Sequence, residues 1–314
     1  MGSMSQPRVL IVGAGAVGGY FGGRLAQAGR DVTFLVRDRR AQQLRQRGLE
    51  IVSPHGDAKI DPNIATTAEL KEPFDLVLLA VKHYALDAAI ADIAPAIGKR
   101  SAILPVLNGM RHLDRLRVAF GRAHVLGGVC IVATTLDADG RIVQLSKMQE
   151  LSYGELDGAL SERIRTIDRA LQGAGFTARL SSSIELEMWE KWVFVAALGG
   201  ITCLLRGTIG EVQHAQRGRD LTIAMLDECV AVATAAGYAP RPAARDRAFN
   251  ILTDAVSDLA SSMYRDLQKG RPLEADAIIG DMCVRGEAAG VKVPLLSAAY
   301  TQLSVYAAKA SESV

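Results

Sequence analysis

The sequence predicts an α/β domain built on a parallel sheet, followed by an all-helical domain. Short aliphatic runs alternate with helical patterns through the first half of the chain, and a glycine-rich turn follows the first run. From about residue 183 the sequence changes to helices rich in Ala, Leu and Met. A length of 314 residues suits two domains of ordinary size, which we place at residues 1–182 and 183–314.

Four runs of nearly continuous aliphatic residues are expected to form buried strands, at 8–12, 31–36, 75–81 and 101–107. Strands consist of nearly continuous apolar residues when helices cover both faces of a parallel sheet. Pro105 lies inside the fourth run. Because proline cannot donate a ladder hydrogen bond, we expect this strand to lie at an edge of the sheet or to be irregular.

The later part of the first domain contains a turn signature. Residues 124–135 and 141–146 flank the turn 137–140 (Asp-Ala-Asp-Gly), which predicts an antiparallel hairpin. The helical domain begins near Ile184 and includes 14 uncharged residues, Trp192–Leu205. A membrane span needs about 20 residues, so this run is expected to be a buried core helix.

Composition and charge argue against several classes of protein. The chain is 49% hydrophobic and 22% charged, as in soluble globular proteins, and 36 basic against 34 acidic residues give no reason to expect a nucleic-acid or membrane partner. The four cysteines form no Cys-x-x-Cys pair and the five histidines form no HExxH, so we expect reduced thiols, no metal site and a cytoplasmic protein. The N-terminal MGSMSQP has no apolar run, so no secretory signal is expected.

The glycine-rich turn has the spacing GxGxxG, directly after the first strand and at the start of a helix. In this context the spacing is the fingerprint of a Rossmann-type dinucleotide-binding domain. Gly13 would allow the tight turn, Gly15 the close approach of a diphosphate, and Gly18 the close packing of helix on sheet. Ala16 and Val17 complete the expected cofactor-binding turn, whose helix would bind the diphosphate at its N-terminus.

The end of the second strand bears on the choice of cofactor. Arg37 would suit the 2′-phosphate of NADP, whereas Asp38 would suit the ribose hydroxyls of NAD. Arg37 comes first, and Arg39 and Arg40 add positive charge, so NADP is favoured. The alternative interpretation is a solvated run of charges.

Two polar residues follow strands at their carboxyl ends, where ligands bind in open α/β sheets. Lys82 follows the third run and Asn108 follows the fourth. Each could also be a loop residue without function.

Several stretches of the chain, taken together, resemble the ketopantoate reductase (2-dehydropantoate 2-reductase) family along nearly its whole length. The matching stretches are GAGAVG, AVK with Lys82, LNGM with Asn108, ELEMWEKW with Lys191, residues 261–276 (SSMYRDLQKGRPLEAD), and GVKVP ending at Pro294.

The resemblance implies roles for five residues of this chain. Lys191 would be the general acid, with Glu274 beside the substrate in the acid–base network. Ser262 and Asn108 would bind the substrate, and Lys82 with Asn108 would bridge the substrate and the nicotinamide ribose.

Each of the catalytic-domain assignments has a structural alternative. Lys191 could form a surface ion pair with Glu187. Ser262 could bond its own helix backbone, and Glu274 could be a helix-start charge after Pro272.

The sequence departs from the family pattern at two positions. Members that reduce ketopantoate usually carry Asn four and eight residues after the catalytic Lys, on the same face of the helix. This chain has Val195 and Gly199 there. A pocket without those amides discriminates less in favour of a substrate hydroxyl, so the substrate is the open question.

We therefore expect an NADPH-dependent reductase of a small branched 2-oxo acid, with ketopantoate, the precursor of pantoate in pantothenate biosynthesis, as the leading substrate. The alternatives are a related reductase of a less polar 2-oxo acid and a non-catalytic NADP(H)-binding sensor. A homodimer would fit, but the sequence leaves the oligomeric state open.

Overall fold

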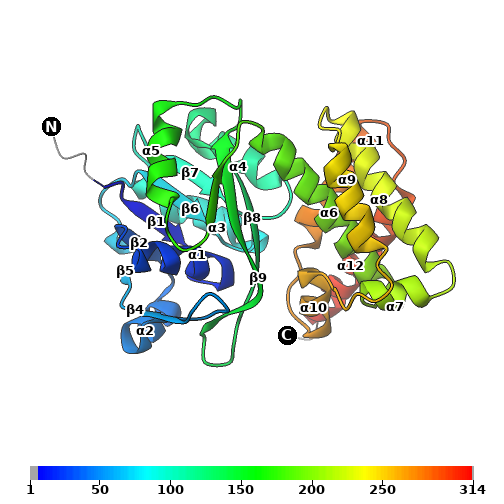
Figure 1. Cartoon of the computed structure of the whole chain (residues 1–314), viewed down its shortest axis with the longest axis horizontal. Coiled ribbons are helices and arrows are strands. Elements are labelled where there is room, and N and C mark those ends of the chain that lie inside the picture. Colours follow the sequence, from blue (N-terminus) through cyan, green and yellow to red (C-terminus); the bar gives the residue numbers. More distant parts are fainter. Residues whose placement is uncertain (1–5, 313–314) are drawn as a thin grey trace. The chain divides into compact units, whose positions relative to one another are not determined.

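The chain divides into two compact units in a computed structural model that describes residues 6–312 (Figure 1). The first unit comprises the chain up to Leu107 together with His112–Glu185. The second comprises Asn108–Arg111 and the chain from Leu186 onward. The chain therefore leaves the first unit for the second time between Glu185 and Leu186. This point lies in the first turn of a long helix, α6 (Ile184–Leu205), which begins where the sequence predicted.

A parallel sheet in the order β5-β2-β1-β6-β7 organises the first unit. Its strands are β1 (Val9–Val12), β2 (Val32–Leu35), β5 (Asn63–Ala65), β6 (Leu76–Leu79) and β7 (Ala102–Pro105). In register, Val9 of β1 pairs with Val32 on one side and Leu76 on the other. The four predicted strands are confirmed, and β5 adds a short strand that the aliphatic pattern did not indicate.

The strand that contains Pro105 ends this sheet, as the proline predicted. Pro105 pairs with Leu79, and the next residue, Val106, donates its N–H to the Leu79 carbonyl at 3.0 Å. An edge position tolerates proline because one side of the strand needs no ladder donor.

A second sheet is built around the predicted hairpin, whose strands are β8 (Leu126–Leu136) and β9 (Ile142–Glu155). The Asp137 carboxylate closes its turn by accepting the backbone N–H groups of Asp139 and Arg141, at 3.0 and 2.8 Å. β9 continues well beyond residue 146, where the sequence signal ended. The sheet is completed by β3 (Leu49–Val52), β4 (Ala58–Ile60) and β10 (Thr177–Leu180).

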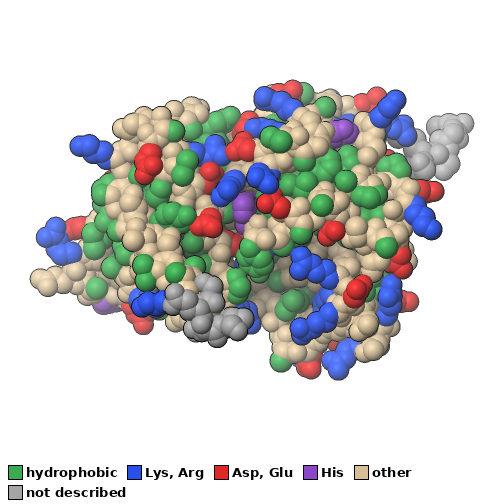
Figure 2. Space-filling model, turned by 180° about the vertical axis from the view of Figure 1, so that it is seen from behind, with side chains coloured by type: hydrophobic (Ala, Val, Ile, Leu, Met, Phe, Trp, Pro, Cys, Tyr) green, Lys and Arg blue, Asp and Glu red, His purple; other side chains and the backbone are tan. Residues whose placement is uncertain are grey.

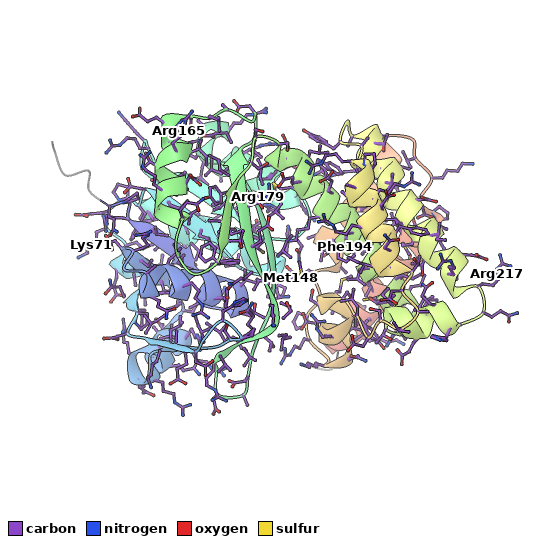
Figure 3. The ribbon with its side chains drawn as sticks, viewed as in Figure 1. Lys71, Met148, Arg165, Arg179, Phe194 and Arg217 are labelled. Carbon is purple, nitrogen blue, oxygen red and sulfur yellow. The ribbon has the colours of Figure 1, made fainter. Side chains whose placement is uncertain are left out.

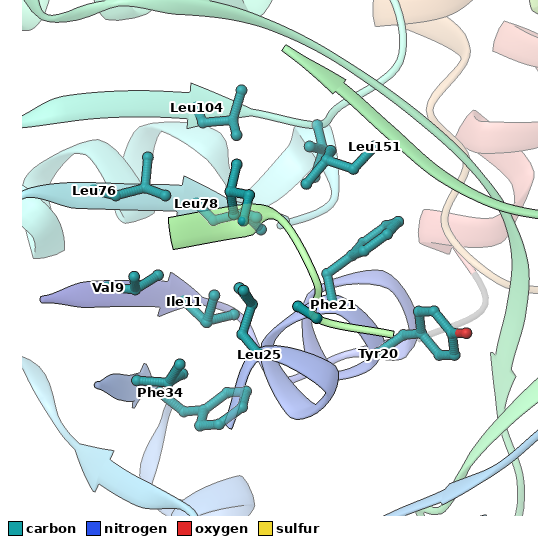
Figure 4. Packing of buried hydrophobic residues seen from close by; sticks show 14 of the residues in the cluster. Val9, Ile11, Tyr20, Phe21, Leu25, Phe34, Leu76, Leu78, Leu104 and Leu151 are labelled. Atoms are coloured by element: carbon teal, nitrogen blue, oxygen red, sulfur yellow. The ribbon is translucent and has the colours of Figure 1, made fainter. Parts of the chain in front are cut away.

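The core of the first unit lies between the sheets and α1 (Ala16–Gln27), as Figure 4 shows. Phe21 of α1 meets Phe176 edge to face, with ring centroids 5.0 Å apart. The other helical segments of the unit are α2 (Asp38–Arg47), η1 (Thr67–Glu69), η2 (His83–Ala85), α3 (Leu86–Ile93), η3 (Ala94–Ala96), α4 (Arg111–Phe120), η4 (Arg122–His124) and α5 (Glu162–Leu171).

Within the described residues, the second unit consists of helices joined by turns. After α6 come α7 (Ile209–His214), α8 (Gly218–Ala235), α9 (Pro242–Leu252), α10 (Ser262–Gln268), a π-helical turn η5 (Asp276–Gly280), α11 (Asp281–Ala288) and α12 (Pro294–Glu312). Among the described helices, α6 alone is long and apolar enough to cross a membrane. However, 67% of its apolar window is buried inside the protein, as in the core helix of a globular domain.

The surface carries both signs of charge. Basic and acidic side chains are interspersed over the face shown in Figure 2. All four cysteines are free and buried, and no group of three or more potential metal ligands occurs among the described residues. Residues 1–5, which make up most of the N-terminal MGSMSQP segment, lie outside the described residues.

Candidate active site

The glycine-rich turn links β1 to α1, and each of its glycines meets a different surrounding. Gly13 has a φ of +94°, which L side chains rarely adopt, so it makes the tight turn. A Cβ on Gly18 would lie 2.2 Å from the Gly13 carbonyl oxygen and 2.9 Å from Ala80 Cβ. Gly18 thus allows α1 to pack directly against the turn and the residue that follows β6.

Gly15 differs because a Cβ built on it meets nothing within 4 Å. It is the N-cap of α1; no side chain caps this end and no acidic residue lies in its first turn. The N–H groups of the first residues of a helix, here beginning with Ala16 and Val17, have no intrahelical acceptor. The turn therefore offers donors, a positive helix end and open space, which is what the diphosphate of a dinucleotide needs.

The basic residues after β2 do not have equal roles. Arg37 is the N-cap of α2 and Asp38 is the first residue of that helix, where the helix dipole stabilises a carboxylate; both side chains are exposed. Arg40 is half-buried: its guanidinium donates to the carbonyls of Ala14 and Gly140, both at 3.1 Å, and burial lowers its pKa. Arg40 therefore connects the hairpin tip to the glycine-rich turn. Of the three arginines, Arg37 and Arg39 are the exposed ones.

Lys82 follows a residue, Ala80, that lies against this turn. It is exposed at the N-cap of the short helix η2, and its carbonyl accepts the N–H of Ala85 at 2.9 Å. Ala80, two residues earlier, lies against both Gly13 and Gly18. The first unit thus brings Lys82 and the glycine-rich turn to one edge of the parallel sheet.

Asn108 was expected to extend from the first domain, but its loop clusters with the second unit. Gly109 has a φ of +79°, and a Cβ there would lie 2.4 Å from the Ala277 carbonyl oxygen and 3.7 Å from Trp192 Nε1. The loop backbone thus packs against α6 and the π-helical turn η5. Sequence order did not reveal this because the loop leaves a strand of the first unit.

Lys191 lies on α6, and its neighbour Trp192 anchors the helix. The Trp192 indole N–H donates to the Ile278 carbonyl at 2.9 Å, and the ring is 1% exposed. The π-helical turn that contains Ile278 begins two residues after Glu274. The segments that carry Asn108, Lys191 and Glu274 therefore contact one another, through residues that lie next to these three in the sequence or a few positions away.

The neighbouring acidic residues of α6 face an arginine. The Glu190 carboxylate accepts the backbone N–H of Arg241 at 2.9 Å. A carboxylate oxygen of Glu187 lies 4.0 Å from the guanidinium of the same arginine. Phe194, labelled in Figure 3, stands three residues after Lys191 on this helix.

The two serines before α10 have separate roles. Ser261 is 5% exposed; its hydroxyl accepts the N–H of Tyr264 at 2.9 Å and lies 2.9 Å from the Thr202 hydroxyl. Ser261 is therefore the N-cap of α10. Ser262 is exposed in the first turn.

Glu274 lies directly before the helical segment that begins at Ala275, at the helix start that the alternative interpretation expected. Its carbonyl accepts the N–H of Ile278 at 3.1 Å, and the chain then forms the π-helical turn. Single π turns inside helices are frequent at functional sites.

The face of α6 one and two turns beyond Lys191 is apolar. A Cβ on Gly199 would lie 2.9 Å from Met263 Cε and 4.0 Å from Ile279 Cδ1. The Met263 methyl group thus fills the space beside Gly199. Sequence reasoning identified Val195 and Gly199 but missed Met263 and Trp192, because only folding brings α10 and the π-helical turn against α6.

The second unit therefore carries an ammonium, a carboxylate, an amide and a hydroxyl on segments that converge or adjoin one another. Such groups can deliver a proton to a developing alkoxide and hold a carboxylate and carbonyl in place. The first unit carries the features of a dinucleotide site.

Two family models match the chain. The model described as "Ketopantoate reductase PanE/ApbA" matches residues 9–158, and the model described as "Ketopantoate reductase PanE/ApbA C terminal" matches residues 183–307.

Curated relatives match nearly the whole chain. An uncharacterized oxidoreductase, YkpB, of Bacillus subtilis is 36% identical over 96% of this chain and 99% of its own. A 2-dehydropantoate 2-reductase of Mesorhizobium japonicum is 27% identical over 93% of this chain and 95% of its own.

Solved structures show the same fold. The 2-dehydropantoate 2-reductase of Geobacter metallireducens has a TM-score of 0.86 at 28% identity, with 95% of this chain and 99% of that chain covered. D-mandelate dehydrogenase, solved with NADH and anilino(oxo)acetate, has a TM-score of 0.87 at 21% identity, with 97% and 99% covered; at this identity the likeness concerns the fold alone.

Proposed function

Because the chain belongs to the ketopantoate reductase family of oxidoreductases, we propose that it reduces a small branched 2-oxo acid to the 2-hydroxy acid with NADPH. Ketopantoate is the leading substrate, and pantoate, a precursor of pantothenate, would be the product. The observation that carries this proposal is the convergence, within one unit, of the segments bearing Asn108, Lys191 and Glu274.

In this proposal the first unit holds the cofactor. The turn from Gly13 to Gly18 would bind the diphosphate, Arg37 the 2′-phosphate, and Lys82 the nicotinamide ribose. The bound dinucleotide supplies a hydride. Arg37 is favoured over Asp38 as the selecting residue because it is the first charged residue after β2 and the exposed Arg39 adds positive charge, while Asp38 stabilises the first turn of α2.

The second unit acts on the substrate. Asn108 and Ser262 would hold the 2-oxo acid, and Ser262 is available because Ser261 caps α10. Lys191 would donate a proton to the alkoxide oxygen that develops at C2. Glu274 would orient the substrate and support the protonated lysine.

The test is turnover by a Lys191→Ala variant. Wild type should oxidise NADPH in the presence of ketopantoate, and Lys191→Ala should lose turnover while its Kd for NADPH, from fluorescence titration, stays at the wild-type value. Lys292→Ala, which removes an exposed lysine of the same unit, is the matched control and should keep wild-type kcat. Unchanged kcat in Lys191→Ala would overturn the proposal.

A second candidate, a less polar 2-oxo acid, is favoured by the apolar face of α6. Val195 provides no amide, and the Met263 methyl fills the space beside Gly199. A site without those amides gains little from a substrate hydroxyl. A panel of 2-oxo acids, run with NADH and with NADPH, decides between the two candidates. A kcat/KM for ketopantoate that exceeds those of the other acids by orders of magnitude would exclude this second candidate. If no acid leads to oxidation of NADH or NADPH, a cofactor-binding sensor would be favoured.

We also propose that the enzyme works in the cytoplasm on a small-molecule substrate. Its four cysteines are free and buried in the described structure, which suits a reducing compartment.

A further inference from the structure

The π-helical turn η5 (Asp276–Gly280) separates Glu274 from α11. A π turn widens the helix by one residue per turn and shifts the groups on either side of it. Such a turn persists only where its surroundings hold it in place. The contacts around it therefore bear on where Glu274 lies.

Contacts from three other segments hold this turn. Trp192 Nε1–H donates to the Ile278 carbonyl at 2.9 Å. The backbone at Gly109 reaches the Ala277 carbonyl so closely that a Cβ would come within 2.4 Å. On α12, the Tyr300 hydroxyl donates to the Asp276 carboxylate at 2.8 Å, and this bond with the nearby negative charge raises the Tyr300 pKa.

Two of these contacts come from residues adjacent to proposed site residues. Trp192 directly follows Lys191, and Gly109 directly follows Asn108. The indole N–H of Trp192 is buried, so a lost bond would leave the Ile278 carbonyl without this donor away from water. The turn is thus a common platform for three segments of the second unit.

We propose that Trp192 is a positioning residue, which sets Lys191 relative to Glu274 through its hydrogen bond to the π-helical turn. Gly109 sets Asn108 on the same platform. The proposal rests on the proposed function, because it takes Lys191 as the proton donor. Proton transfer is sensitive to displacements of about 1 Å, so the rigidity of this platform should be visible in the rate.

The test removes the indole N–H. Trp192→Phe should lower kcat at least tenfold and leave the Kd for NADPH within twofold of wild type. It should also leave the KM for the 2-oxo acid within twofold of wild type, because a misplaced proton donor slows the chemical step and not substrate binding. Trp189→Phe is the matched control: Trp189 lies one turn earlier on α6, and its ring packs against Tyr238 at 5.4 Å and against Trp192 at 5.0 Å. Phenylalanine keeps an aromatic ring there and leaves the bond from Trp192 to Ile278 in place, so this variant should keep wild-type kcat and KM.

A second replacement separates the hydrogen bond from packing. Benzothienylalanine at position 192 keeps the size of the ring and lacks the N–H, so it should reproduce the loss of kcat at unchanged KM even if the phenylalanine variant folds poorly. Gly109→Ala should raise KM for the 2-oxo acid and leave the Kd for NADPH unchanged, because it displaces the Asn108 loop.

Wild-type kcat in the benzothienylalanine protein would overturn the positioning role. A lower Tm with unchanged kcat would show a purely structural tryptophan and would overturn it equally. If wild type itself reduces no 2-oxo acid, the proposed function fails instead, so the two failures are distinguishable.

Discussion

Two glycines of the same turn should respond in opposite ways to an added methyl group. Gly18→Ala places a Cβ 2.2 Å from the Gly13 carbonyl oxygen and 2.9 Å from Ala80 Cβ. Gly15→Ala places one where nothing lies within 4 Å, at a φ of −85° and ψ of −162° that alanine adopts freely. We predict that the first change damages the fold and the second damages cofactor binding.

The expected magnitudes follow from these contacts. Overpacking against backbone costs about 1–3 kcal/mol. At about 2–4 °C per kcal/mol for a domain of this size, a cost of about 2 kcal/mol lowers the Tm of Gly18→Ala by about 4–8 °C. Gly15→Ala should keep the wild-type Tm, or its free energy of unfolding should rise by about 0.4–1 kcal/mol because alanine restricts the unfolded chain. Its methyl group should raise the Kd for NADPH at least tenfold, about 1.4 kcal/mol of binding free energy.

Thermal unfolding followed by circular dichroism measures the first effect, and fluorescence titration with NADPH measures the second. Each variant controls for the other, since both add one methyl group to the same turn. Wild-type NADPH affinity in Gly15→Ala would refute the assignment of this turn to the diphosphate. A wild-type Tm in Gly18→Ala would refute the steric argument.

Three further predictions concern charge and thiols. Arg37→Ala should raise the Kd for NADPH about tenfold and barely change that for NADH, which lacks the 2′-phosphate; Arg45→Ala is the control, and equal losses for both cofactors would contradict NADP selection. A thiol reagent should label no cysteine before unfolding, because all four are buried and desolvation raises the pKa of Cys203 to about 11; labelling of the native protein would contradict this. Hydrogen bonds from Thr208 lower the pKa of Glu211, so its stabilisation of α7 is fully present above the ordinary value of 4.5 and is lost as pH falls through the lowered pKa. Glu211→Gln should therefore destabilise the protein at neutral pH and not in acid, as urea unfolding at both pH values would show.

Local signals predicted much of the first unit. The aliphatic runs identified β1, β2, β6 and β7, because strands buried on both faces need apolar residues throughout. The turn signature identified the β8–β9 hairpin, since its Asp and Gly fit a tight turn. The short strand β5 and the long extension of β9 carried no such signal, because their pairing depends on distant partners.

The candidate site also has a part that local sequence predicts and a part that it does not. The sequence by itself determined which chemical groups are present and where the glycine-rich turn lies, because side-chain identity and short spacings are local properties. Only the tertiary structure decided which serine caps α10, that the Asn108 loop belongs with the second unit, and that Trp192 and Met263 contact the π-helical turn and the space beside Gly199. Those facts depend on contacts between residues far apart in the sequence, 86 positions for Trp192 and Ile278 and more for Gly109 and Ala277, which only the packing of α6 and the π-helical turn against their neighbours creates.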